Sequence, residues 1–328
     1  MSELTIEELL SNRDKILSIK SRVDSHDPSM FDHFVVNNCD ITPETITIVM
    51  TASNRSKQTY FTLQSMLKSK CKNLQIILVD DSTDDPVSLN ILKNYPYYID
   101  LIVVNRATKN WVNPCVNYNI GFQFIQGRIV VIQNAEVCYI GDPLRHIRDN
   151  IKDDEYFVFD VISSIGYDSN EEIYKSDLTD ILICNEPFFS SWYQHSVHNN
   201  RNLHFFTSMT RKTFTKINEF SYDYSIAMDF DDDDFVLKIS SRNINIINVT
   251  VDIYHICGIH LYHGMSHNTW GKGIKTNESV YNFKKDEFAK NAGHEVVGVQ
   301  GFAGEISEAQ RMESRKSNDK TQTYIEFI

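Results

Sequence analysis

The stretch LQIILVDDSTDD, residues 74–85, joins an almost fully apolar run to two adjacent aspartates. An apolar run of this length, bounded by polar residues, is typical of a strand that is buried on both faces, as in a parallel sheet. Similar runs occur at ITIVMT (46–51), IDLIVV (99–104) and RIVVIQ (128–133), and helix-like stretches lie between them. This alternation predicts an α/β fold with a mostly parallel central sheet flanked by helices.

Composition limits the classes of partner and of site. The 328 residues carry a formal net charge of −12, which argues against a nucleic-acid partner because phosphates would be repelled. The first residues are charged and lack an apolar signal region, and no apolar run approaches the length of a membrane span. The six cysteines are scattered, as expected of reduced thiols. These features together predict a cytoplasmic protein without a transmembrane segment.

Polar side chains follow three of the predicted strands. In open parallel sheets, ligands bind outside the carboxyl ends of the strands, so these residues should converge on one crevice. A carboxylate there can accept a hydrogen bond from a base N–H, and an arginine can contact a phosphate. Neither G-x-G-x-x-G nor a P-loop is present, which argues against a dinucleotide site or a Walker site. The predicted donor-binding residues at the strand ends are Thr51, Ala52, Ser53, Arg55, Asp80, Asp81, Asn134 and Ala135.

Four motifs in order resemble family 2 glycosyltransferases over roughly residues 45–270. TIVMTASNRS (47–56) is similar to the family's first strand with its T-Y-N-R loop, and LQIILVDDSTDD to V-D-D-G-S-x-D. The segment 113–137 resembles the stretch that runs from A-R-N-x-G to D-x-D, and 209–239 resembles the acceptor segment that ends in E-D-D-D-[FL]-x-x-R. The resemblance implies a GT-A fold and a nucleotide-sugar donor, with UDP as the expected nucleotide. It also adds Asn119, in the N-x-G position, to the predicted donor-binding residues.

The same resemblance implies a domain organisation. Residues 45–274 would form the GT-A domain, with a nucleotide-sugar-binding half (45–140) and an acceptor or catalytic half (141–274). Residues 1–44 are predicted to be a helical extension. Residues 275–328 are predicted to be a helical tail that is flexible in part.

A metal site is predicted where the family has D-x-D, at Asn134-Ala135-Glu136. Glu136 keeps the carboxylate of the last position, whereas Asn134 keeps an oxygen but loses a charge; the alternative is an ordinary strand-end turn. By resemblance, His260 or His263 would complete the shell around Mn²⁺ or Mg²⁺. We expect one of these two to reach the cation, because residues three apart on an extended segment point to opposite faces. Zinc, with Cys257 as a further ligand, is the alternative.

The acidic run that ends in Asp231–Asp234 precedes a helix-like stretch. By resemblance, Asp232 aligns with the family's catalytic base. Crowded carboxylates also raise one another's pKa, which suits a general base that works near neutral pH. Acceptor binding is predicted for Asp231, Asp233, Asp234 and the aromatic Trp192. The alternative is that the run only stabilises a helix N-terminus.

The predicted function is transfer of a sugar from a UDP-sugar to a glycan or other hydroxyl acceptor, with inversion and with metal assistance. Two alternatives remain open. A catalytically silent nucleotide-sugar-binding protein would explain the missing Asp at position 134. A sugar nucleotidyltransferase shares an acidic metal site but normally has a Gly-rich basic loop after the first strand, and TASNRS is not such a loop.

Overall fold

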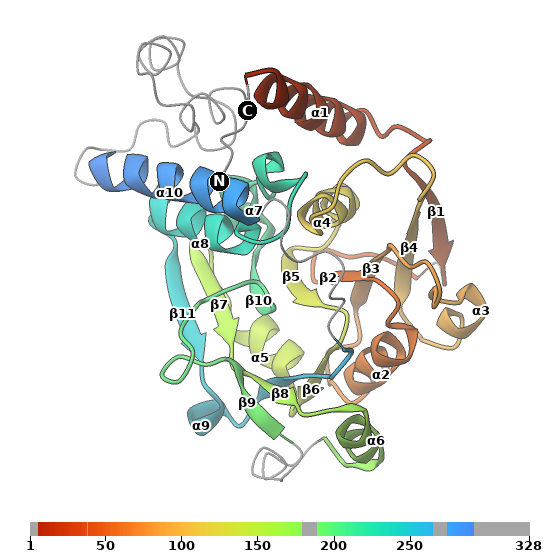
Figure 1. The fold of residues 1–328 in the computed structure, drawn as a ribbon. Coiled ribbons are helices and arrows are strands. Elements are labelled where there is room, and N and C mark those ends of the chain that lie inside the picture. Colours follow the sequence, from red (N-terminus) through yellow and green to blue (C-terminus); the bar gives the residue numbers. More distant parts are fainter. Residues whose placement is uncertain (1–5, 38, 179–188, 265–273, 292–328) are drawn as a thin grey trace.

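The computed structural model describes residues 6–37, 39–178, 189–264 and 274–291 (Figure 1). Its centre is an eight-stranded sheet with the order β1-β4-β3-β2-β5-β10-β7-β11. The strands are β1 (Phe31–Val36), β2 (Ile46–Ala52), β3 (Leu74–Asp80), β4 (Tyr98–Val104), β5 (Ile129–Asn134), β7 (Glu155–Phe159), β10 (Phe206–Thr210) and β11 (Asn245–Val249).

The four predicted apolar strands are β2, β3, β4 and β5, and they pair in parallel with one another. Ile48, for example, lies opposite Ile76 of β3 and Val131 of β5. The mostly parallel α/β sheet predicted from the sequence is therefore confirmed. Since these strands are parallel, their carboxyl ends meet at one edge, where Thr51, Asp80 and Asn134 lie.

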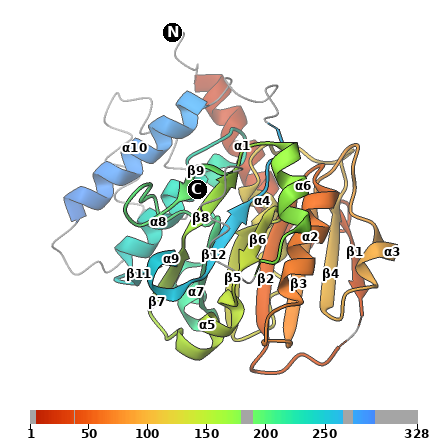
Figure 2. The same ribbon diagram turned by 90° about the horizontal axis from the view of Figure 1, so that it is seen from below.

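Helices cover both faces of this sheet, so the core has two halves (Figure 2). One face carries α1 (Ile6–Asp24), α4 (Cys115–Phe122), α7 (Arg211–Ile217), α8 (Asp231–Ser241) and α10 (Ile274–Asn291). The other face carries α2 (Ser56–Met66), α3 (Leu89–Leu92) and α5 (Pro143–Asn150). Burial of apolar side chains on both faces explains why β2 to β5 are nearly continuous apolar runs.

A second, four-stranded sheet has the order β6-β12-β8-β9. It consists of β6 (Val137–Ile140), β8 (Val161–Ser164), β9 (Phe189–Gln194) and β12 (Cys257–His260), and its core also receives α6 (Tyr167–Lys175) and α9 (Val251–Tyr254). β6 begins three residues after β5 ends, so the turn Ala135-Glu136 joins the two sheets. This turn brings the start of the second sheet beside the ligand edge of the first.

The N-terminal extension was predicted to be helical, but only its first part is. After α1, strand β1 joins the edge of the main sheet and pairs with β4 in an antiparallel direction, with Phe31 opposite Val104. His33 Nε2 lies 2.8 Å from Asp100 Oδ1 across this pair. β1 has four exposed residues between two buried ones, so its sequence lacks the alternation that marks a strand.

The C-terminal helix α10 is anchored by buried polar contacts. Lys284 pairs with Asp223 and lies 3.5 Å from Asp234 Oδ1, and its Nζ donates to Ser221 Oγ at 2.9 Å. Burial opposes ionisation of Lys284, but these carboxylates outweigh it and raise its pKa. The end of the tail, predicted to be flexible, lies outside the described residues. None of the helices in the described ranges has the length and apolar character that crossing a membrane requires.

Candidate active site

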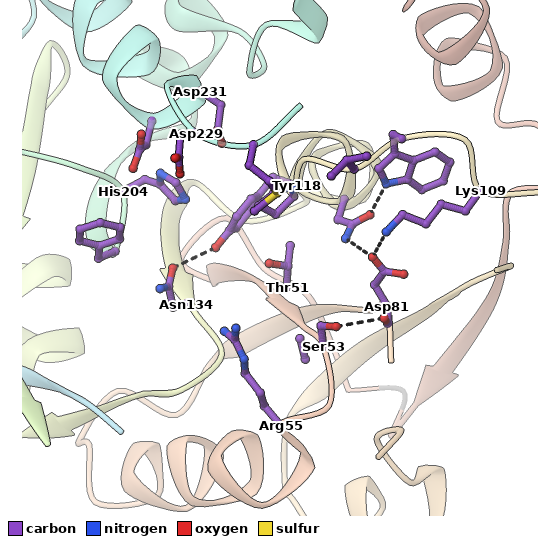
Figure 3. Close-up of a pocket in the computed structure, with 18 of the residues that line it drawn as sticks. Thr51, Ser53, Arg55, Asp81, Lys109, Tyr118, Asn134, His204, Asp229 and Asp231 are labelled. Atoms are coloured by element: carbon purple, nitrogen blue, oxygen red, sulfur yellow. Dashed lines mark hydrogen bonds and ion pairs between the residues drawn. The ribbon is translucent and has the colours of Figure 1, made fainter. Parts of the chain in front are cut away.

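A cavity of about 610 Å³ opens at the carboxyl edge of β2, β3 and β5 (Figure 3). Its volume is in the range of pockets that hold small molecules. Three further segments reach it: residues 106–118, the loop before β10, and the loop before α8. The lining residues are Thr51, Ala52, Ser53, Arg55, Asp81, Arg106, Lys109, Trp111, Val112, Pro114, Asn117, Tyr118, Asn134, His204, Phe205, Met228, Asp229, Asp231 and Asp232.

At one end of the cavity, Asp81 is surrounded by donors. Arg106 Nη1 lies 2.5 Å from its Oδ1, Lys109 pairs with its Oδ2, and Asn117 Nδ2 donates to the same oxygen at 3.2 Å. Burial lowers the pKa of Lys109, although Asp81 opposes the shift. Trp111 Nε1 donates to Asn117 Oδ1 at 2.8 Å and so fixes that amide. This end offers a carboxylate, two cations and an indole ring to a ligand.

Asp80, predicted to bind the donor, has a structural role instead. Its carboxylate accepts hydrogen bonds from the backbone N–H groups of Ser82 (3.1 Å) and Val87 (2.8 Å) and from Ser82 Oγ, and the residue is 1% exposed. Asp80 is the last residue of β3 and does not line the cavity, whereas Asp81 is the first residue after it. The structure thus separates two aspartates that the sequence treats alike.

Exchanging each of these aspartates for asparagine should separate stability from binding. Asp80→Asn should lower the free energy of unfolding by about 1–3 kcal/mol, because buried hydrogen bonds to a charged acceptor are lost, with little change in UDP affinity. Asp81→Asn should weaken UDP binding about tenfold and change stability less. Urea denaturation and calorimetry measure the two quantities. An equal loss of UDP affinity in both variants would return Asp80 to the donor site.

Asn119 and Ala135, also predicted to bind the donor, are buried away from the cavity. Asn119 connects α4 to the segment after α7: its Nδ2 donates to the carbonyl oxygen of Phe220 and its Oδ1 accepts from the Phe220 N–H, both at 2.9 Å. Gly121 lets α4 approach the sheet, since a Cβ there would lie 3.0 Å from Val49 Cγ1. The N-x-G pattern therefore has a packing explanation in this chain. Ala135 is fully buried in the turn after β5.

Glu136 lies behind the cavity wall, at the centre of a group of cationic and imidazole side chains. Its Oε1 is 2.6 Å from Arg55 Nη1, 3.4 Å from His260 Nε2 and 3.6 Å from His263 Nε2. Asn134 Nδ2 is 3.4 Å from the same oxygen. Burial alone would raise the pKa of Glu136, but Arg55 and the two imidazoles outweigh it and hold the pKa of that carboxyl well below its usual range. Burial, then Arg55, lowers the pKa of His263 to about 4.

The donor set of Glu136, His260 and His263 fits a divalent cation. Their ligand atoms lie within 4.8 Å of one another. Glu136 Oε2 and His260 Nε2 are buried and have no hydrogen-bond partner in the part of the chain that the structure describes. Unpaired polar atoms of this kind cost free energy unless a ligand satisfies them. One carboxylate and two imidazoles are a known ligand set of catalytic Zn²⁺, which keeps the zinc alternative open, whereas Mn²⁺ would call for further oxygen ligands, such as those of a diphosphate.

The expectation that only one of the two histidines could reach this group is wrong. It assumed an extended strand from His260 to His263, but β12 ends at His260. The Tyr262 N–H donates instead to the side chain of Asn170, at 3.0 Å from its Oδ1. Both imidazoles therefore face Glu136. Their rings lie 5.2 Å apart, centroid to centroid, in an edge-to-face arrangement.

At the other end of the cavity, the acidic run begins α8. Asp231 and Asp232 line the cavity, and so does Asp229. Burial, and next the charge of Asp232, raise the pKa of Asp231 to about 8, and its Oδ1 accepts from Asn113 Nδ2 at 2.9 Å. Burial also raises the pKa of Asp232, which Arg201 opposes. Two carboxyl groups with shifted pKa values in one cavity suit proton transfer.

Three residues predicted to bind the acceptor do not line the cavity. Asp233 faces Arg201, whose Nη2 is 3.4 Å from its Oδ2. Asp234 is fully buried and accepts from Tyr224 OH at 3.3 Å, beside Lys238 and Lys284. Trp192 packs against His195, with ring centroids 4.4 Å apart, in the second sheet. Asp233 and Asp234 thus have side-chain partners outside the cavity, whereas Asp232 Oδ1 accepts from the Asp233 N–H at 2.9 Å at the start of α8, so the helix-stabilising alternative stays open for Asp232.

Several lining residues lie outside the set predicted from the sequence. Arg106 and Lys109 follow β4, and the strand-end argument would have found them had it been applied to that strand. His204 follows none of the predicted strands, but it lies in a loop rich in aromatic and histidine residues, a composition expected of an acceptor groove, and it reaches the cavity just before β10. Burial lowers its pKa to about 3, so it is neutral, and its Nδ1 has no hydrogen-bond partner among the described residues. Its ring meets Tyr118 edge to face at 5.0 Å.

The chain is similar to several solved structures. GalNAc-T7 with UDP, GalNAc and Mn²⁺ is 14% identical over 88% of this chain and 55% of that chain, with a TM-score of 0.50. S. aureus TarS 1-349 in complex with UDP-GlcNAc is 13% identical over 77% of this chain and 68% of that chain, with a TM-score of 0.50. The mannosyltransferase PcManGT from Pyrobaculum calidifontis, in complex with GDP-Man and Mn²⁺, is 13% identical over 85% of this chain and 74% of that chain, with a TM-score of 0.43. The chain thus spans about half the length of the GalNAc-T7 chain.

A search of curated protein sequences finds no significant match. The model of the family described as "Glycosyl transferase family 2" matches residues 47–229, more than half of the chain. This range runs from β2 to the loop before α8 and so includes every strand end that borders the cavity. The GT-A fold that the sequence resemblance implied is confirmed, and the chain belongs to glycosyltransferase family 2.

Proposed function

We propose that this protein transfers a sugar from a UDP-sugar to a hydroxyl acceptor with inversion at the anomeric carbon. The observation that supports this most is the polarity of the cavity. One end, at Asp81, Arg106 and Lys109, suits the base and the phosphates of a nucleotide, and the other end, at Asp231 and Asp232, suits a hydroxyl that must lose a proton. The neighbouring structures with UDP or UDP-GlcNAc bound support a nucleotide-sugar donor.

Each end has a defined chemical task in this proposal. Arg55, Arg106 and Lys109 offset the charge of the diphosphate, which the chain's net negative charge would otherwise repel. Asp232 accepts the proton of the attacking hydroxyl as the new bond forms. Asp231, with a pKa of about 8, is mostly protonated at neutral pH and donates a hydrogen bond instead of competing for that proton.

Glu136, His260 and His263 would hold Mn²⁺, or Mg²⁺, beside the cavity. When bound, the cation supplies Lewis-acid stabilisation of the leaving diphosphate. Arg55 connects this group to the donor, because it lines the cavity and contacts Glu136.

Calorimetry with UDP and GDP, each with and without Mn²⁺, Mg²⁺ or Zn²⁺, tests the donor and the metal. We expect UDP to bind more tightly with Mn²⁺, and a UDP-sugar hydrolysis assay to give turnover. Nucleotide binding without hydrolysis or transfer would favour the silent binding protein. Turnover that requires pyrophosphate would favour the nucleotidyltransferase.

The pH dependence of turnover should respond to Arg201. The base must be ionised, so activity is lost as pH falls through the raised pKa of Asp232. Arg201 lowers that pKa, and it is half exposed and does not line the cavity. Arg201→Gln should therefore move the acid limb of kcat to higher pH, by less than about one unit. An acid limb that stays in place would mean that Asp232 does not control it.

A further inference from the structure

The guanidinium of Arg55 lies where it would meet a cation bound to Glu136. Arg55 follows β2 and occupies the N-cap position of α2, where its side chain makes no capping hydrogen bond. Its Nη1 is 2.6 Å from Glu136 Oε1, the oxygen that also faces both imidazoles. A divalent cation held by Glu136, His260 and His263 would sit about 2.0–2.3 Å from its ligand atoms. The cation and the guanidinium would then be a few ångströms apart, with charges of the same sign.

Like charges this close, next to a carboxylate that is 1% exposed, are poorly screened by water. The Glu136 carboxylate can neutralise one of them at a time. The Arg55 side chain has room to turn away from Glu136, because it is 27% exposed and lines the cavity. Figure 3 shows the Arg55 side chain rising from the start of α2 toward Asn134, within the cavity proposed to hold the donor.

We propose that Arg55 and a divalent cation are alternative partners of Glu136, and that the guanidinium displaced by the cation turns to the diphosphate of the donor. This inference rests on the proposed function and adds to it a coupling between metal and nucleotide. Breaking the Arg55–Glu136 ion pair opposes metal binding. A bound diphosphate attracts the freed guanidinium and so reduces that opposition.

The coupling must be reciprocal, because it is a free energy shared by the two binding events. UDP should tighten Mn²⁺ binding, and Mn²⁺ should tighten UDP binding by the same factor. Direct coordination of the diphosphate by the cation contributes to this factor and does not depend on Arg55. Substitution of Arg55 should remove only the share of this factor that depends on Arg55.

The test measures the dissociation constant of Mn²⁺, from the electron paramagnetic resonance signal of the free ion, with and without UDP. The Mn²⁺–UDP complex that forms in buffer is the reference. Wild type is compared with Arg55→Gln, with Arg55→Lys, which keeps the charge, and with Lys57→Gln. Lys57 is the matched control: it lies in the first turn of α2, two residues after Arg55, pairs with Glu171 and is largely exposed.

Without UDP, Arg55→Gln should bind Mn²⁺ about tenfold more tightly than wild type, because no ion pair has to break. The factor by which UDP tightens Mn²⁺ binding should be several-fold smaller in Arg55→Gln than in wild type. Arg55→Lys should lie between the two, and Lys57→Gln should match wild type. If Arg55→Gln does not fold, Arg55→Lys is compared with wild type. Arg55→Lys should then bind Mn²⁺ more tightly than wild type without UDP, and UDP should tighten that binding by a smaller factor.

Two results would overturn the inference while leaving the proposed function intact. One is a wild type that binds both Mn²⁺ and UDP while Arg55→Gln binds Mn²⁺ no more tightly. The other is tighter Mn²⁺ binding with an unchanged effect of UDP, which would mean that Arg55 stays on Glu136 and acts only through its charge. A wild type that binds neither ligand would instead overturn the proposed function itself, and the inference with it.

Discussion

Replacing Asp232 with asparagine should lower turnover by about 10²- to 10⁴-fold, the usual contribution of a positioned general base. Asparagine keeps the shape of the side chain but lacks the basic oxygen, so the attacking hydroxyl would keep its proton. UDP affinity should change little, because Asp232 lines the cavity next in sequence to Asp231, which lies away from Asp81 in Figure 3. Initial rates of donor hydrolysis, followed by transfer once the acceptor is identified, measure the effect.

Asp233→Asn is the matched control, because it makes the same chemical change one residue along α8. Asp233 does not line the cavity and faces Arg201. If the acidic run only stabilised the helix N-terminus, both variants would lose a similar, modest amount of stability and activity, since asparagine caps nearly as well as aspartate. Wild-type transfer by Asp232→Asn would leave the proposed inverting mechanism without its base.

The central strands could be predicted because the burial of each strand is visible in its own sequence. β2, β3, β4 and β5 are buried on both faces, which requires nearly continuous apolar runs. β10 has the sequence FTSMT and could not be recognised in this way, although all five of its residues are buried. Its antiparallel pairing with β5 and β7 depends on contacts between segments that are far apart in the chain.

Within the site, the strand-end argument located Thr51, Arg55, Asp81 and Asn134 correctly at the cavity edge. It could not separate Asp80 from Asp81. Which of two adjacent aspartates turns into the cavity depends on the hydrogen bond from Val87 N–H to Asp80, and that contact exists only in the folded chain.

The histidines illustrate a second limit. The spacing of His260 and His263 predicts opposite faces only while the strand continues, and the end of β12 at His260 carries no clear signal in the sequence. The convergence of both rings on Glu136 also requires β6 and β12 to pair, with Val137 opposite His260. The types of residue in a sequence can thus indicate candidate metal ligands, but the relative positions of these ligands depend on how the strands pair.

Replacing Glu136 with glutamine should weaken Mn²⁺ binding by at least about a hundredfold and remove the stimulation of UDP binding by metal. Loss of a residue that only supports a ligand already costs 10- to 100-fold, and Glu136 is proposed to be a ligand itself, the one anionic member of its group. The variant should fold, since Arg55, left without its carboxylate, is 27% exposed and can reach water. Electron paramagnetic resonance of free Mn²⁺ and calorimetry with UDP give the two quantities.

Glu44→Gln is the control with the same chemical change, because Glu44 is exposed and its Oε2 lies 4.0 Å from Arg128 Nη2. Unchanged Mn²⁺ affinity in Glu136→Gln would make Asn134-Ala135-Glu136 an ordinary turn between β5 and β6, with Arg55 as the permanent partner of its carboxylate.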